Sequence, residues 1–460
     1  MALAAVSRAG AGEGTGSVPT VRLDLTVLIP AFNEAENLRL LLPRVHRVAH
    51  ELSLAYEVLV VDVAAHAETL AVTRDQGARL LTQVAPGYGG ALLEGFREAR
   101  GGYILTMDAD CSHEPSVITK LWAHRNRADI IVASRYIRGG VAYMSWVRKW
   151  LSRVLNRVFT RGLSVDVRDI SSGFRLYKAS VVKGLQVTGT DFDILPEIIV
   201  RAHVDGWTIL EVPFTYFPRA KGTSRARVIR VGINLLKTFA KLWRLRHSVR
   251  AADYDERAFY SAIPLQRYWQ RRRHRIVTTM ARGRSRTLDV GCGSSLILQS
   301  LNHAVGLDVL HHKMRYMRRY GLEVVTGSVF ALPFADERMD CVICSEVIEH
   351  VPADPAIFME LDRVLRPGGL LILGTPDYAT WSWPLIERLY GLAAPGGYAC
   401  EHISHYTRAG IQGLLGAMGY DVVETRYVFG SELIVSAQKG GGRAVPETLA
   451  PLLSAIHVHA

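Results

Sequence analysis

The sequence has 460 residues, of which 49% are hydrophobic and 21% charged, and its formal net charge at pH 7 is +12. This length suits roughly two to three domains with sizeable cores, which excludes a chain that is disordered throughout. No apolar run reaches the roughly 18 residues of a membrane-spanning helix, and residues 1–21 lack the apolar core of a signal peptide, so we expect a flexible tail there. Five scattered cysteines favour a reducing compartment over a disulfide framework.

Apolar runs typical of β-strands alternate with helical patterns through most of the chain. One series begins at Leu25 and a second begins at Thr287. This alternation predicts α/β layers built on mostly parallel sheets. The other expected strands are Tyr56–Asp62, Tyr103–Met107 and Ile130–Ser134 in the first half, and Ala304–Asp308, Met339–Ser345 and Leu370–Gly374 in the second.

Two acidic residues, Asp108 and Asp110, follow an apolar strand that ends at Met107. Carboxylates two residues apart at a strand end can bind one hard divalent cation, Mg²⁺ or Mn²⁺, which prefers oxygen ligands and can bridge to a diphosphate. Such a cation neutralises the charge that grows on a departing nucleoside diphosphate. Taken alone, the pair is explained more simply as a solvated acidic turn.

Other residues of the first half lie where a nucleotide could bind. Pro30–Glu34 follows the first strand, Asp62 ends the second, and Gly87–Gly90 precedes a helix. Each feature also has a simpler explanation. Glu36 and Asn37 are residues of the kind that begin helices, and the glycines suit an ordinary turn.

Together with later motifs, these residues resemble the family 2 glycosyltransferases, in particular dolichol- and polyprenol-phosphate mannose synthases, over about residues 22–248. The matching segments after Asp110 are Ala133–Tyr136, Gly139–Gly140, Trp146–Lys149, Asp169–Tyr177, Glu197, Glu211–Pro213 and Arg219–Arg225. The resemblance implies a GT-A fold, a nucleoside-diphosphate sugar donor, with GDP-mannose expected, and a polyprenyl-phosphate acceptor.

The resemblance also implies roles for individual residues. Asp108 and Asp110 would hold the metal ion and the donor diphosphate, and they would be catalytic together with Arg135 and Arg219. The donor nucleotide would contact Pro30, Phe32, Glu34, Asp62, Asp108, Ala109 and Asp110. The acceptor phosphate would contact Arg135, Arg219, Ser224 and Arg225. The planar fork of arginine suits phosphate, although each arginine taken singly is explained more simply by a surface salt bridge.

The expected reaction makes modest demands on the protein. A lipid phosphate is already anionic at neutral pH, so it can attack the anomeric carbon, with inversion, without a general base, while the protein aligns it and stabilises the leaving diphosphate. One feature departs from the family pattern: Asp62 is followed by Val63-Ala64-Ala65 in place of a further Asp and Gly-Ser. This loss of polar groups motivates an alternative, in which the first half is a degenerate module that docks on membranes or binds substrate.

Two segments have the pattern of amphipathic helices. In Trp146–Arg161 a basic stripe (Lys149, Arg153, Arg157, Arg161) lies beside an apolar face (Trp146, Trp150, Leu151, Val154, Phe159). Val228–Arg246 repeats the pattern more weakly, with Leu235, Leu236, Phe239, Leu242 and Trp243. Such faces usually pack on a protein core, but they also suit a membrane interface. Given a lipid acceptor, we expect peripheral contact with an anionic membrane surface, on its cytoplasmic side.

Residues 249–285 are expected to form a basic helical connector, which includes the run Arg271–Arg275. Such a run suggests a nucleic-acid methyltransferase as a rival function. Basic runs are more often solvated or face lipid, and no aromatic platform interleaves with this one. We therefore expect no nucleic-acid partner.

The second half opens with a glycine-containing turn, in which Asp289, Gly291 and Gly293 end an apolar strand. Glycines let the backbone approach a ligand closely. Asp308 ends the next strand, 19 residues after Asp289 (308 − 289 = 19). That spacing suits a strand–helix–strand unit whose second carboxylate meets ribose hydroxyls. A structural turn is the simpler explanation of Gly-x-Gly by itself.

With Gly327–Phe334, Met339–His350 and Leu365–Gly369, this turn resembles the class I S-adenosylmethionine (SAM)-dependent methyltransferases over about residues 254–438. The resemblance implies SAM as the cofactor, contacted by Asp289, Gly291, Gly293, Asp308, Val329 and Phe334. Ser295 and Ser328 stand where the family commonly has a third glycine and an adenine-contacting Asp. The residues that could act as a base on a methyl acceptor are His350, His402 and His405, although a structural role suits each of them equally well.

Cys341 and Cys344 form a Cys-x-x-Cys pair, a spacing that is also found in zinc and redox sites. In a β-strand, residues three apart point to opposite faces. The pattern therefore predicts buried structural thiols.

These patterns predict an α/β protein with a GT-A nucleotide-sugar-binding fold followed by a Rossmann-like class I methyltransferase fold. The expected segments are 1–21 (flexible tail), 22–248 (glycosyltransferase), 249–285 (connector), 286–438 (methyltransferase) and 439–460 (flexible tail). The expected function is bifunctional. One half would transfer a sugar, with mannose expected, to polyprenyl or dolichyl phosphate, and the other would methylate a related sugar or lipid-linked product. The alternative is a methyltransferase whose first half is a degenerate docking or substrate-binding module.

Overall fold

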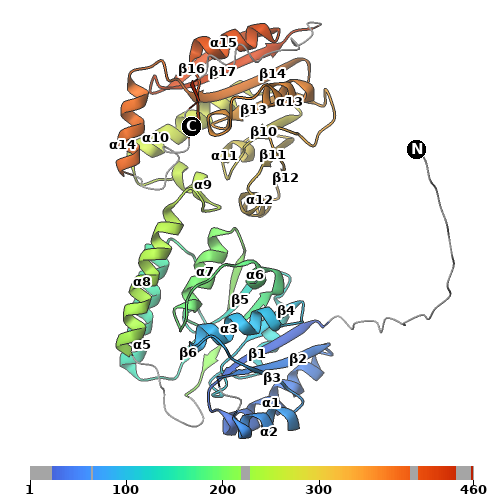
Figure 1. The fold of residues 1–460 in the computed structure, drawn as a ribbon, viewed down its shortest axis with the longest axis vertical. Coiled ribbons are helices and arrows are strands. Elements are labelled where there is room, and N and C mark those ends of the chain that lie inside the picture. Colours follow the sequence, from blue (N-terminus) through green and yellow to red (C-terminus); the bar gives the residue numbers. More distant parts are fainter. Residues whose placement is uncertain (1–22, 64–65, 219–227, 394–401, 442–456, 459–460) are drawn as a thin grey trace, which may run out of the picture.

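The computed structural model describes residues 23–63, 66–218, 228–393, 402–441 and 457–458. Two seven-stranded sheets organise the described chain, one in each half (Figure 1). The expected α/β class is therefore confirmed.

The first sheet is mixed, in the order β3-β2-β1-β4-β7-β5-β8. Its strands are β1 (Leu25–Ala31), β2 (Tyr56–Asp62), β3 (Arg79–Thr82), β4 (Tyr103–Thr106), β5 (Ile130–Ser134), β7 (Arg175–Lys178) and β8 (Ile209–Pro213). Strand β7 runs antiparallel between β4 and β5, while β1 to β4 are mutually parallel. Two short strands, β6 (Val141–Ala142) and β9 (Thr215–Tyr216), pair outside this sheet.

Helices cover both faces of the first sheet because successive strand side chains point in opposite directions. Leu28 packs in a cluster with Phe96 and Leu242, whereas its neighbours Val27 and Ile29 pack in a second cluster. The first cluster draws on α3 (Gly87–Glu98), α5 (Trp146–Gly162), α6 (Ala179–Gly184), α7 (Ile194–Val204) and α8 (Val228–His247). The second draws on α1 (Ala35–Glu51), α2 (Ala67–Asp75) and α4 (Val117–Ala123).

The second sheet has the order β12-β11-β10-β13-β14-β17-β16. Its strands are β10 (Thr287–Val290), β11 (Ala304–Asp308), β12 (Glu323–Thr326), β13 (Met339–Ser345), β14 (Leu365–Pro376), β16 (Tyr420–Val428) and β17 (Glu432–Lys439). The first five are parallel and the last two form an antiparallel extension. The helices are α11 (Leu296–Gln299), α12 (His311–Arg318), η1 (Ile348–His350), α13 (Pro355–Val364), α14 (Ser382–Ala393) and α15 (Arg408–Ala417).

The expected connector is helical, but it also forms part of the second core. It contains α9 (Tyr254–Phe259) and α10 (Pro264–Met280). Ile276 and Val277 of α10 pack in one cluster with Ile343 of β13 and Ile434 of β17. Within the expected tail at 439–460, the described residues His457–Val458 form β18, which pairs antiparallel with β15 (Ser404–His405). Residues 442–456 and 459–460 lie outside the described residues. The tail expected at 1–21 lies outside the described residues.

Candidate functional site

Three strands of the first sheet deliver the predicted donor residues to one edge. β1, β2 and β4 are parallel, with Ala31 opposite Asp62 and Leu28 opposite Thr106. The chain leaves these strands at Phe32, Val63 and Met107, so the residues that follow gather at their carboxyl ends. Ligands of open α/β sheets bind at such an edge.

Asp108 and Asp110 occupy this edge, each held by neighbouring groups. The Asp108 carboxylate accepts a hydrogen bond from the Tyr88 hydroxyl at 3.2 Å. The Asp108 backbone N–H donates to Nδ1 of His113 at 3.0 Å, which leaves the ring proton on Nε2, and Nε2 lies 3.7 Å from the Asp108 carboxylate. Asp110 accepts from the backbone N–H of Ser112 at 3.0 Å.

The electrostatics of this pair suit a cation. Burial raises the pKa of Asp108; His113 opposes that rise, and the charge of Asp110 adds to it. Burial also lowers the pKa of His113, whose ring stacks on Phe174 with centroids 4.8 Å apart. Burial disfavours a positive charge on His113, and the two carboxylates offer oxygen atoms at one strand end, so the residues present fit a bound divalent ion.

Tyr88 is a residue of this site that sequence reasoning missed. Its ring stacks on Phe192 with centroids 4.7 Å apart, which fixes the hydroxyl beside Asp108. A Cβ at Gly173 would fall 2.7 Å from that hydroxyl, so any larger residue there would displace the Tyr88 hydroxyl. Tyr88 was visible in the sequence only within a glycine-rich loop, with no pattern to link it to an aspartate 20 residues away.

The remaining donor residues differ in what they offer. Phe32 is 45% exposed and stands edge-on to the ring of His66, as an exposed stacking surface would. Asp62 is buried and accepts from the backbone N–H of Val63 at 2.8 Å. Glu34 accepts from the Asn37 amide, which ties the loop to the start of α1. Pro30 is half-buried within β1, and Ala109 is buried between the two acids.

Arg135 lies in an ion pair that the sequence did not reveal. Its Nε and Nη2 donate to the two carboxylate oxygens of Asp169 at 2.8 and 2.7 Å, and Nη2 also donates to Ser171 at 2.9 Å. Asp169 is fully buried. Arg135 is therefore rigidly positioned, and its contact with phosphate stays a prediction. The other predicted phosphate contacts, Arg219, Ser224 and Arg225, lie outside the described residues.

The glycine turn of the second half adopts a conformation that favours glycine. Gly291 and Gly293 have φ of 69° and 53°. A Cβ at Gly293 would lie 2.6 Å from a carboxylate oxygen of Asp255, so the turn has no room for a side chain. Asp308 accepts from the backbone N–H groups of Gly293 at 2.9 Å and Leu310 at 2.8 Å. The turn and the predicted ribose carboxylate are thus joined directly.

Two further groups complete this edge of the second sheet. Asp255 accepts from Ser294 and from the buried Lys313, whose Nζ lies 2.8 Å away, a support for the turn that sequence reasoning missed. Asp289 is buried, and one of its carboxylate oxygens has no hydrogen-bond partner. Burial and the charge of Asp308 raise the pKa of Asp289 to about 7. A buried acceptor without a partner beside a glycine cradle fits a ligand such as SAM.

The two apolar positions predicted to contact the cofactor lie in the same core cluster. Val329 is buried in it, and Phe334 is half-buried and packs against it. Ser328, which stands where the family commonly has an Asp, accepts from the backbone N–H of Phe330.

The cysteine pair and one arginine of the basic run have structural roles. Cys341 and Cys344 are both buried and belong to clusters on opposite faces of β13, as predicted. In the basic run, Arg273 points inward: its Nε donates to Glu432 at 2.5 Å and its Nη2 lies 3.0 Å from Glu346. This arginine is therefore an internal ion-pair partner.

An exposed apolar surface runs along α5. Its members, with exposures from 40% to 79%, are Trp146, Val147, Trp150, Leu151, Val154 and Val158. Phe159, predicted on the same face, is instead buried against Phe239 of α8, with ring centroids 5.2 Å apart. In α8, Leu242 is also buried, while Leu236 and Trp243 are exposed. No helix in the described part of the chain has the length and apolarity needed to cross a bilayer.

Comparisons with known proteins match the two halves of the chain to two different families. The family model "Glycosyl transferase family 2" matches residues 26–185, and the model "Methyltransferase domain" matches residues 288–373. A dolichol-phosphate mannosyltransferase of Pyrococcus furiosus is 33% identical over 215 residues, which are 45% of this chain and 60% of that protein. A polyprenol monophosphomannose synthase of Mycolicibacterium smegmatis is 33% identical over 257 residues, 52% of this chain and 92% of that protein.

A solved structure also resembles part of the chain at low identity. A SAM-dependent methyltransferase from Thermotoga maritima is 19% identical, covers 42% of this chain and 97% of its own, and has a TM-score of 0.35.

Proposed function

Because the chain belongs to glycosyltransferase family 2 and continues into a methyltransferase domain, we propose that it is bifunctional. The first half, 22–248, transfers a sugar from a nucleoside-diphosphate donor to polyprenyl phosphate. The expected sugar is mannose and the expected donor is GDP-mannose. The second half, 286–438, joined through 249–285, methylates a related sugar or lipid-linked product. The observation that carries the proposal is the acidic pair Asp108 and Asp110 at the sheet edge, in the half of the chain that is 33% identical to a polyprenol monophosphomannose synthase.

The residues of the first site would have separate roles in sugar transfer. Asp108 and Asp110 would hold Mg²⁺ or Mn²⁺, which supplies positive charge for the leaving diphosphate. Tyr88 and His113 orient Asp108 before substrate arrives. The acceptor phosphate needs alignment and no general base, because it is already an anion. Arg135, held by Asp169, has the fixed guanidinium that such alignment requires.

The test is an assay with the full chain, Mg²⁺ or Mn²⁺, labelled GDP-mannose and other nucleotide sugars, and polyprenyl phosphate. We expect label to enter the organic phase only when a polyprenyl phosphate and a divalent cation are both present. If the label remained in the aqueous phase with every donor, the transferase proposal would be wrong. Mass spectrometry of the product with and without SAM then reports whether a methyl group is added.

The apolar surface of α5 supports peripheral contact with a membrane, which we propose to be at its cytoplasmic face. We expect Trp146→Ser together with Trp150→Ser to weaken binding to vesicles that contain anionic lipid by about 10-fold or more, since burying each large side chain contributes about 1.5–3 kcal/mol. Co-sedimentation measures the change. Trp381→Ser is the matched control, because Trp381 is 84% exposed but lies in the other half. Equal vesicle binding by both variants would show that α5 does not face lipid.

The second site gives a pH prediction. Since the pKa of Asp289 is raised to about 7, this carboxyl is protonated below pH 7 and ionised above it. An anionic carboxylate attracts the positively charged SAM, so we expect SAM affinity to rise between pH 6 and 8, and Asp289→Asn to flatten that rise. Burial also makes ionisation of Asp289 costly in the folded state. The free energy of unfolding of the wild type should therefore fall as pH rises toward 7, whereas that of Asp289→Asn should not.

Calorimetric titration with SAM and thermal unfolding, both at pH 6 and pH 8, measure these two trends. Asp75→Asn, an exposed carboxylate in the first half, serves as the control. A wild type and an Asp289→Asn variant with parallel pH profiles would contradict the role of Asp289.

A further inference from the structure

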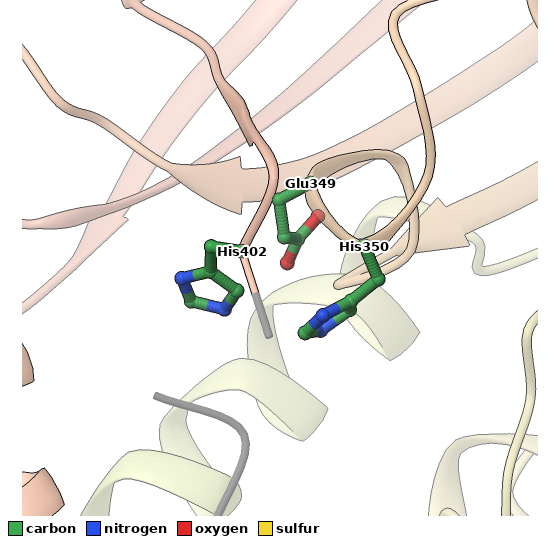
Figure 2. Close-up of side chains that lie close together, drawn as sticks. All are labelled: Glu349, His350 and His402. Atoms are coloured by element: carbon green, nitrogen blue, oxygen red, sulfur yellow. The ribbon is translucent and has the colours of Figure 1, made fainter. Parts of the chain in front are cut away.

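Three potential metal ligands converge in the second half, outside the predicted SAM contacts. Glu349 and His350 belong to η1, and His402 comes from the segment before β15. One ligand atom from each lies within 4.8 Å of the others. Figure 2 shows the Glu349 carboxylate directed toward the space between the two imidazole rings. The two segments are fixed to each other by a hydrogen bond from the Ile403 backbone N–H to the Glu349 carbonyl at 2.9 Å.

The environment of Glu349 indicates a ligand. It is completely buried, and neither of its carboxylate oxygens has a hydrogen-bond partner. A buried carboxylate is costly unless it is paired, hydrogen-bonded or bound to a metal. The packing of the core therefore does not explain why both carboxylate oxygens of Glu349 are buried without a hydrogen-bond partner.

His402 is oriented as a metal-binding histidine. Its Nδ1 lies 3.1 Å from a carboxylate oxygen of Glu387 and 3.0 Å from the Tyr378 hydroxyl. With its proton directed to Glu387, the ring presents an unprotonated Nε2 on the opposite side. A carboxylate behind the ring in this way fixes the tautomer and raises the basicity of the ligand nitrogen.

From this geometry we propose that Glu349, His350 and His402 form a binding site for a zinc-class divalent cation. Two imidazole nitrogens and one carboxylate oxygen are a ligand set that zinc accepts, and three protein ligands leave a fourth position for an oxygen ligand, either water or a hydroxyl group. Tetrahedral zinc ligands lie about 3.4 Å apart, so side-chain adjustment suffices to close the cluster. The site differs in ligand chemistry from Asp108 and Asp110, whose all-oxygen set suits Mg²⁺ or Mn²⁺.

The cluster also adjoins the predicted cofactor turn. Val347 lies two residues before Glu349, and its Cγ2 would be 2.2 Å from a Cβ placed on Gly291. A metal at the cluster would thus stand at the same sheet edge as the SAM site. Metal binding as such does not depend on the proposed function, and it can be measured without any substrate.

The test uses the full chain after chelator treatment and dialysis. Zinc binding is measured by competition with a chromophoric chelator, and Co²⁺ substitution reports the coordination number through its visible absorption. We expect one tight zinc per chain, lost by at least about 100-fold in affinity in His402→Gln and in Glu349→Gln. Glu387→Gln leaves all three ligands in place and should weaken binding about 10- to 100-fold.

Two controls make the outcome decisive. His303→Asn changes an exposed histidine of the same half and should bind zinc as the wild type does. The double variant Asp108→Asn/Asp110→Asn should also keep the zinc, which separates this site from the predicted Mg²⁺ or Mn²⁺ site. Should Glu349→Gln fail to fold, as judged by circular dichroism, Glu387→Gln remains informative. Absence of tight zinc binding, or binding that survives His402→Gln and Glu387→Gln unchanged, overturns the proposal.

Discussion

Sugar transfer to polyprenyl phosphate is expected to fall by about 10³-fold when Asp108 and Asp110 are both replaced by asparagine. Asparagine keeps the size of each side chain, so the contacts with Tyr88 and Ser112 can persist, but it removes both negative charges. Without them the divalent cation and the donor diphosphate lose their anchor. The measurement is the initial rate of label transfer into the organic phase at a saturating concentration of Mg²⁺ or Mn²⁺.

The double variant leaves the second sheet untouched, so methyl transfer and SAM binding should equal those of the wild type. Asp75→Asn, at an exposed position of α2, controls for the loss of a negative charge from the first half. If the double variant transferred sugar at the wild-type rate, the acidic pair would not hold the metal. If neither protein transferred sugar while both methylated an acceptor, the first half would be a docking or substrate-binding module.

Strands were the most predictable part of the fold. β2, β5, β11 and β13 have the predicted limits, because an apolar run bounded by polar residues defines a buried strand. β14 begins at Leu365, ahead of the predicted Leu370, since its first residues extend the strand through the Arg366–Gly369 turn-like sequence. Leu365 pairs with Met339 and Leu370 with Cys341, so the Arg366–Gly369 run between them has no partner in β13 and forms an irregularity in the pairing. The glycines therefore marked a real interruption, and only the pairing of Leu365 places the start of the strand before it.

The faces of amphipathic helices were less predictable. Phe159 and Trp150 read alike in the sequence of α5, yet Phe159 is buried and Trp150 is 59% exposed. The difference arises because Phe159 packs against Phe239 of α8, a helix that follows α5 by more than 60 residues and lies beside it in Figure 1. Local periodicity identifies the helix, whereas its partner in space selects the buried stripe.

Long-range pairings within the sites could not be predicted at all. The Arg135–Asp169 and Arg273–Glu432 pairs span 34 and 159 residues. In the sequence Arg273 is one residue of a basic run, and only the packing of α10 against β17 turns it inward. Motif residues at strand ends, such as Asp108 and Asp308, were predictable because parallel strands bring their carboxyl ends to a common edge.

Replacing Asp308 by alanine is expected to weaken SAM binding by about 10²-fold or more, because a ribose offers two hydroxyls and each hydrogen bond to a charged group contributes about 1.5–3 kcal/mol. The same carboxylate accepts from the N–H groups of Gly293 and Leu310, so alanine also loosens the glycine turn. The two N–H groups donate to different carboxylate oxygens, so Asp308→Asn keeps one of these hydrogen bonds through its amide oxygen while it loses the charge. We expect it to bind SAM with intermediate affinity in calorimetric titration. Sugar transfer by the same preparations reports whether the first half is intact, and wild-type SAM affinity in Asp308→Ala would contradict the ribose assignment.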